Sequence, residues 1–111
     1  MATQSRYQIQ ILNLVKTEDL PNFSLELQQD FRDICESILA HDPYSCCGFP
    51  NHHLKGKLKD YRSLEIDYLA IAYRLVYRIY EKPSPKRVVI ISFDEHDSAY
   101  DKAKTRTGRK K

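Results

Sequence analysis

The stretch Leu54–Tyr80, LKGKLKDYRSLEIDYLAIAYRLVYRIY, decides the fold, because it joins a basic loop to two strand-like runs. Two sets of residues alternate in its last part: Tyr73, Leu75, Tyr77 and Ile79 on one side, and Arg74, Val76, Arg78 and Tyr80 on the other. A period of two predicts a strand with two different faces, one buried and one carrying guanidinium groups. Together with the lysines upstream, this open face favours contact with phosphate.

The length and the apolar content indicate one globular domain. A chain of 111 residues can bury one core but has no room for a second domain. We assign residues 1–103 to that domain and residues 104–111 to a basic C-terminal tail. The longest uncharged apolar run, Val88–Ile91, is far shorter than the roughly 20 residues that span a bilayer, so we expect no membrane partner.

The N-terminus and the cysteines favour the cytoplasm. The first residues, MATQSRYQIQILNLV, lack the apolar core and the cleavage site of a secretory signal. The three cysteines are an odd number, and Cys46 and Cys47 are adjacent, which makes them poor disulfide partners. We therefore expect free thiols in a reducing compartment.

The charge is distributed unevenly along the chain. Residues 1–50 contain three Lys or Arg against seven Asp or Glu, and residues 51–111 contain fifteen against eight. The halves thus carry −4 and +7, which gives the overall +3. A basic half attracts phosphate without conferring sequence specificity, although ordinary surface solvation explains such a pattern as well.

The N-terminal half predicts one strand followed by helices. Residues 7–14 alternate as a strand with one polar face, and Pro21 leaves room for one or two helical turns after Thr17. From about Ser24 to His41, apolar residues recur every three or four positions, which is typical of an amphipathic helix. The acidic opposite face is interpreted as solvated.

Residues 43–53, PYSCCGFPNHH, have no clear period and are predicted to form a loop. Its cysteines and histidines are ligand types that zinc prefers, but adjacent cysteines lack the usual spacing of two to four residues. We therefore predict no metal site and no other cofactor.

The C-terminal part predicts a hairpin and a short helix. The proline-rich segment 81–86 is a turn between two strands, and the apolar run Arg87–Phe93 is typical of a strand in the middle of a sheet. Asp97 could cap a short helix over residues 98–103. The last ten residues contain six cations and almost nothing to bury, which predicts a disordered tail.

The order of these elements resembles the RelE/ParE family of bacterial toxin components. The likeness covers residues 7–103 and depends on Leu54-Lys55-Gly56-Lys57-Leu58, on Tyr73-Arg74-Leu75-Val76-Tyr77, and on the late His96 and Tyr100. It implies an α+β fold, a small twisted and mainly antiparallel sheet of about four strands with N-terminal helices packed on it. The residue patterns independently predict the same elements.

The RelE branch implies a ribosome-dependent endoribonuclease, in which the ribose 2′-hydroxyl of messenger RNA attacks the adjacent phosphate. Such chemistry needs a base, an acid and cations. The resemblance assigns catalytic roles to His96, Tyr100 and Arg74, with Asp97 or Glu95 orienting His96. It places Lys55 and Lys57 near the phosphate, while the basic run and the alternating strand add three further candidates for phosphate or RNA binding: Lys59, Arg62 and Arg78.

One segment departs from the family pattern. Active relatives carry an arginine in the strand after the basic loop, whereas here Arg62 is near but out of register and Glu65 occupies the place of a cation. Neighbouring residues of a strand face opposite sides, so an odd shift moves Arg62 off the active face. A non-nucleolytic relative therefore stays open, either a ParE-like inhibitor of DNA gyrase or an inactive antitoxin-binding partner, and so does a general RNA-binding module.

The resemblance also implies partners. These are a cognate antitoxin protein that covers the cations, and the ribosome with its messenger RNA, or alternatively DNA gyrase.

Overall fold

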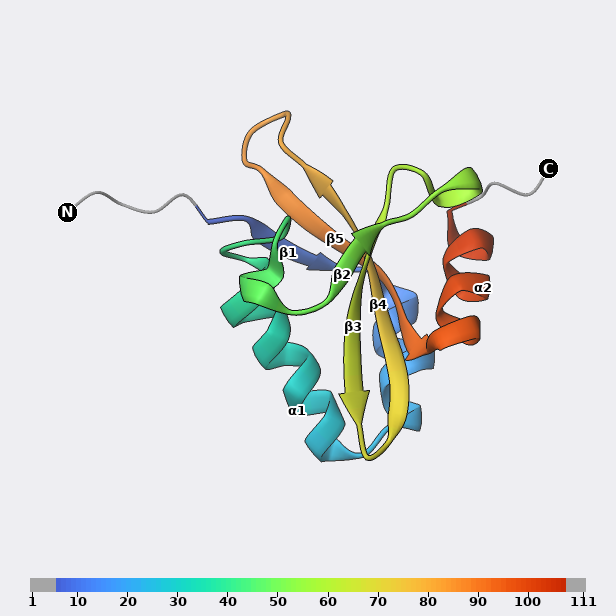
Figure 1. Cartoon of the computed structure of the whole chain (residues 1–111). Coiled ribbons are helices and arrows are strands. Elements are labelled where there is room, and N and C mark those ends of the chain that lie inside the picture. Colours follow the sequence, from blue (N-terminus) through green and yellow to red (C-terminus); the bar gives the residue numbers. More distant parts are fainter. Residues whose placement is uncertain (1–5, 108–111) are drawn as a thin grey trace.

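The computed structural model describes residues 6–107 and has an α+β fold built on one five-stranded sheet (Figure 1). The strand order is β1-β5-β4-β3-β2, and β1 pairs with β5 in parallel while the other pairs are antiparallel. The strands are β1 Gln8–Ile11, β2 Asn51–His53, β3 Arg62–Tyr68, β4 Ile71–Tyr80 and β5 Arg87–Glu95. The predicted fold class is confirmed, with one strand more than expected.

Strand β4 has the two-faced pattern that its sequence predicts. The protein has two hydrophobic cores, one on each face of the sheet. Tyr73, Leu75 and Tyr77 are buried in the larger core, together with Phe31 from the N-terminal helices. Val76, from the alternate set, packs into a smaller core on the other face of the sheet. This strand, and not β5 as predicted, occupies the centre of the sheet. Strand β5 is an interior strand one place further out, and both its faces are covered.

An irregularity in β5 places two neighbouring residues on one face. Val76 pairs with Ser92 while Tyr77 pairs with Ile90, so Ile91 is an extra residue. Ile91 packs in the smaller core, and the Ser92 hydroxyl donates to the Ala99 carbonyl at 2.8 Å. This β-bulge therefore turns both side chains toward the C-terminal helix.

The N-terminal helices cover the face of the larger core. They are η1 Val15–Asp19, η2 Leu20–Asn22, α1 Leu25–Ile34 and η3 Cys35–Leu39, of which the last continues α1. Ser24 caps α1, since its hydroxyl accepts from the Leu27 amide at 3.1 Å. The predicted amphipathic helix and the short helical turns before it are confirmed.

The segment predicted as one loop contains β2 and the turn η4 Cys46–Gly48. It has no readable period because β2 is only three residues long and lies at the sheet edge. The loop is tied to the core by Tyr77, whose buried hydroxyl donates to the Pro43 carbonyl at 2.7 Å. The short helix η5 Gly56–Leu58 follows within the basic stretch.

Helix α2, His96–Arg106, lies on the other side of the sheet from α1 (Figure 1). It begins two residues before the predicted segment, with Glu95 at the capping position and without a capping hydrogen bond from Asp97. It also extends three residues past Ala103, so residues 104–106, predicted as tail, are helical. Residues 108–111 of that tail lie outside the described residues.

The cysteines are free thiols, as expected, with Cys35 and Cys46 buried and Cys47 exposed. Within residues 6–107, no helix has the length and apolar character needed to cross a membrane.

Candidate functional site

A cleft of about 270 Å³ opens between the basic loop and α2, on the sheet face opposite α1. Its lining comes from β2, from the segment after it and from α2: His52, Leu54, Lys55, Leu58, His96, Tyr100 and Lys104. Leu54 and Leu58 contribute to the smaller core, which gives the cleft an apolar base. Imidazole, phenol and ammonium groups surround that base, so the cleft can hold an anion and exchange protons with it.

Three of the predicted site residues meet in this cleft. Lys55 enters from the basic loop, while His96 and Tyr100 lie one turn apart on α2. The rings of His96 and Tyr100 touch edge to face, with centroids 5.0 Å apart. Asp97 does face His96 as expected, since its Oδ1 lies 2.8 Å from Nδ1. Glu95 instead takes the position before the helix.

The hydroxyl of Tyr100 is held at the sheet surface by Ser63. It donates to the Ser63 Oγ at 3.1 Å, and Ser63 itself is fully buried. Ser63 pairs with His52 across β2 and β3, so both side chains leave the sheet on the same face. The contact therefore fixes the phenol at β3, next to strand β2, which carries His52.

Arg74 shares this face but does not line the cleft. Its Nη1 donates to the Tyr73 carbonyl at 3.0 Å, and its Nη2 lies 3.8 Å from the Oε1 of Glu65. The other oxygen of Glu65, Oε2, lies 3.7 Å from the Nδ1 of His52. With only 13% of its side chain exposed, Arg74 is an internal cation that Glu65 partly neutralises.

Arg62 lies on the opposite face, as the register argument predicts. It pairs with Tyr77 of the larger core. Its Nη2 donates to the Tyr44 carbonyl at 2.9 Å and to the Asn51 Oδ1 at 2.7 Å. These contacts brace the loop before β2, and the guanidinium group is not directed toward the cleft.

The remaining members of the predicted basic set do not line the cleft. Lys57 belongs to η5 and Lys59 follows it, and both are exposed. Arg78 lies further along β4, where its guanidinium carbon sits 4.7 Å from the centroid of the Tyr80 ring and 5.6 Å from that of Tyr61. Cations stacked on aromatic rings are common in nucleic-acid surfaces and in ordinary packing alike.

Sequence reasoning missed two residues of the cleft. The sequence offers His52 only as a zinc ligand, because no local pattern predicts β2 or the direction of its side chains. Lys104 was placed in the tail, although it lies one turn beyond Tyr100 on α2. The spacing of four between His96, Tyr100 and Lys104 is a signal that could have grouped them on one helix side.

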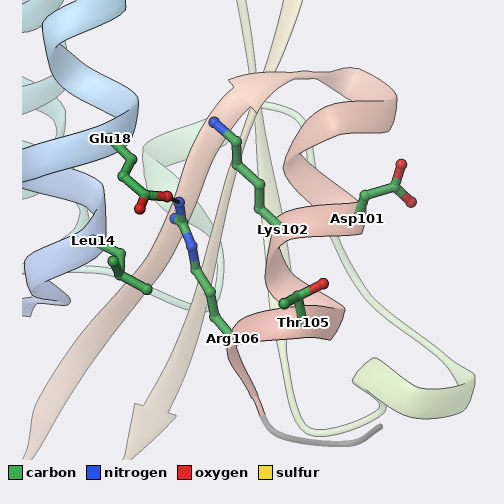
Figure 2. A pocket seen from close by; sticks show the side chains of 6 residues that line it. All are labelled: Leu14, Glu18, Asp101, Lys102, Thr105 and Arg106. Atoms are coloured by element: carbon green, nitrogen blue, oxygen red, sulfur yellow. Dashed lines mark hydrogen bonds and ion pairs between the residues drawn. The ribbon is translucent and has the colours of Figure 1, made fainter.

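A second cavity, of about 380 Å³, lies on the other side of α2 (Figure 2). There Arg106 reaches from α2 to Glu18, with Nη2 3.3 Å from Oε1. Behind it, the fully buried Asp19 accepts from Arg106, Lys102 and the Phe93 amide. Its cations are bound within this network, so we take the cavity as a structural junction.

Asp19 is ionised in this junction. Burial alone would raise the pKa of its carboxyl, but the hydrogen bonds from Arg106, Lys102 and the Phe93 amide outweigh burial and lower the pKa below its ordinary value. The network thereby holds α2 in place, and with it the residues on its opposite side.

No group of three or more His, Cys, Asp or Glu among residues 6–107 is arranged to hold a metal ion. Comparisons with protein-family models, with curated proteins and with solved structures find no match to this chain.

Proposed function

We propose that this chain is the toxin component of a toxin-antitoxin system, a RelE-like, ribosome-dependent endoribonuclease that cleaves messenger RNA in the cytoplasm. The observation that carries the proposal is the cleft in which Lys55, His96 and Tyr100 meet. The resemblance points to all three residues, and they come from segments about 40 residues apart in the chain.

The composition of the cleft suits phosphodiester chemistry. Ammonium groups of Lys55 and Lys104 offset charge that builds on the phosphate, and His96 is a side-chain type that exchanges protons near neutral pH. The Tyr100 hydroxyl, which donates to Ser63 in the free protein, can turn its proton to a bound phosphate. A cognate antitoxin would act by covering this basic face.

The test is expression of the chain alone, followed by primer extension on cellular messages. Growth should stop, and cuts should map inside translated codons. In purified, programmed ribosomes, cleavage should leave a 2′,3′-cyclic phosphate, and a 2′-deoxy nucleotide at the cut site should block it. Growth arrest with intact messages would contradict the proposal.

Two observations favour a second candidate, a non-nucleolytic protein of the same fold that inhibits DNA gyrase or only binds an antitoxin. Arg62 faces away from the cleft, and Glu65 lies against Arg74, which reduces the positive charge available to a phosphate. A supercoiling assay with purified gyrase separates the two candidates. Inhibition of gyrase without RNA cleavage would support the second one.

A further inference from the structure

The turn between β3 and β4 consists of Leu69 and Ala70, whose backbone lies in the left-handed region with φ of 50° and 65°. Tyr68 pairs with Ile71 across it, so this is a two-residue hairpin turn with positive φ at both positions. Asparagine and glycine usually fill such a turn, because the Cβ of other residues comes too close to the backbone. Leu69 is moreover 79% exposed. The turn therefore carries a backbone strain and an exposed apolar side chain that the hairpin itself does not require.

Leu69 belongs to an apolar patch at one end of the molecule. Ile71 is exposed just after the turn, and Leu25, the first residue of α1, is 82% exposed. The two elements meet at this end, since the hydroxyl of Tyr68 donates to the Oε1 of Glu26 (Figure 1). Apolar side chains that are exposed together mark an interaction surface, whereas scattered single ones do not.

A cavity of about 550 Å³ adjoins this patch, between the β3–β4 turn and the start of α2. Residues 70–72 give it an apolar wall, and Glu95 and Asp97 give it carboxyl groups. Among residues 6–107, no lysine or arginine lines it. We call this end of the molecule the acidic tip and define it by three apolar and two acidic residues: Leu25, Leu69, Ile71, Glu95 and Asp97.

We propose that the acidic tip docks a protein segment that presents apolar side chains flanked by lysine or arginine. Carboxyl groups repel the phosphates of nucleic acids and of anionic lipids, which leaves a protein as the occupant. A basic amphipathic helix fits both parts of the surface, because its apolar face covers Leu69 and Ile71 while its cations reach Glu95 and Asp97. The proposal does not depend on the nuclease function, and its partner differs from an antitoxin that covers the basic face.

The first experiment selects binders from a displayed library of random helical peptides, with the full chain as bait. Bound peptides should be enriched in Lys or Arg next to apolar residues, although the overall charge of +3 favours acidic ones. Amide NMR signals of the isotope-labelled chain should then shift at Leu69, Ile71 and Asp97 when the strongest peptide is added. Enrichment of acidic peptides, no enrichment, or shifts confined to the basic loop overturns the proposal.

The second experiment replaces the turn by Leu69→Asn with Ala70→Gly, the pair that left-handed backbone favours. The midpoint of thermal unfolding should rise, while the affinity for the selected peptide should fall about tenfold or more. Loss of binding by a more stable protein is not a folding defect. Phe49→Ser is the control, because it removes an exposed apolar side chain from the loop before β2. Wild-type affinity in the double variant, or an equal loss in Phe49→Ser, overturns the proposal.

The third experiment tests the charge of the acidic tip with Glu95→Gln. Glu95 is exposed and makes no capping hydrogen bond to α2, so the change should leave the fold intact. Peptide affinity should fall at low salt, and its dependence on salt should become weaker, because one ionic contact is lost. Glu36→Gln, at an exposed acid of η3, should change neither quantity. Equal effects of the two changes would assign the attraction to overall charge and overturn the proposed site.

Discussion

The guanidinium group of Arg106 holds the buried carboxylate of Asp19 through two hydrogen bonds, 2.8 Å from Nη1 to Oδ2 and 2.9 Å from Nη2 to Oδ1. The two residues are 87 positions apart in the chain. Arg106 and Lys102, which also binds Asp19, lie on the side of α2 away from Tyr100. The junction therefore sets the position of α2, and through it the wall of the cleft.

Replacing Asp19 by Asn should destabilise the fold strongly. The change leaves Arg106, whose side chain is 4% exposed, without its buried counter-ion. Removing one partner of a buried ion pair costs about 3–5 kcal/mol, which urea unfolding would measure. Glu18→Gln is the matched control, because Glu18 contacts the same guanidinium but is 59% exposed. Its loss should cost no more than about 1 kcal/mol, and equal losses in the two variants would contradict the buried role of Asp19.

The carboxyl group of Asp19 should make the free energy of unfolding depend on pH in the acidic range. The folded-state pKa of Asp19 is lowered, because the hydrogen bonds from Arg106 and Lys102 outweigh the effect of burial. Its contribution is therefore fully present above the unfolded pKa, about 3.9 for aspartate, and is lost as the pH falls through the lower folded-state value. Urea unfolding between neutral and acidic pH should show the difference between wild type and Asp19→Asn shrinking in that window. A difference that stays constant there would oppose this reading.

The strands could be predicted where the sequence alternates over a long run. Tyr73, Leu75 and Tyr77 face the larger core as their spacing indicates, since a period of two determines which side chains share a face. The out-of-register Arg62 could be placed for the same reason. By contrast, β2 has three residues and makes its hydrogen bonds with β3, so no local signal marks it or the direction of His52.

The C-terminal end of α2 could not be predicted for a different reason. A run such as Lys102–Arg106 offers little apolar surface, and composition alone indicates disorder. What stabilises it is Asp19, which in the sequence resembles a solvated acid at a helix start. Interactions between residues so far apart depend on the fold that brings them together, and charge patterns along the chain do not reveal them.

Removing the hydroxyl of Tyr77 should destabilise the loop before β2. This buried group donates to the Pro43 carbonyl at 2.7 Å, and Tyr77→Phe would leave that acceptor with only the weak Cys46 thiol donor at 3.7 Å. The expected cost is about 1–3 kcal/mol, measured by thermal or urea unfolding. Tyr44→Phe is the control, because the Tyr44 hydroxyl donates to Glu81 at 2.7 Å in an exposed setting where water can replace it. A cost for Tyr44→Phe as large as that for Tyr77→Phe would argue against burial as the cause.

Neutralising the lysines of the cleft should weaken RNA binding in a salt-dependent way. Lys55→Gln and Lys104→Gln each remove one cation from the lining. For single-stranded RNA, each lost phosphate contact lowers the slope of log affinity against log salt by about 0.7. Fluorescence anisotropy of a labelled oligonucleotide over a range of KCl concentrations measures that slope. Lys16→Gln, at an exposed lysine of η1, should leave it unchanged, and a slope that responds equally to all three changes would exclude a specific role for the cleft.

Removing the hydroxyl of Tyr100 should cost more activation free energy in RNA cleavage than free energy of unfolding. In the free protein this group donates to Ser63 at 3.1 Å, and with RNA bound it can turn its proton to the phosphate while the Ser63 hydroxyl donates to it. A hydrogen bond to charge that develops in the transition state contributes about 10²–10³-fold, so Tyr100→Phe should lose that factor in single-turnover cleavage. Ser63→Ala removes the same contact but keeps the phenol, so its rate should fall much less. If the two variants lose activity equally, the Tyr100 hydroxyl serves packing of α2 against the sheet, and the charge on the phosphate is met by Lys55 and Lys104 alone.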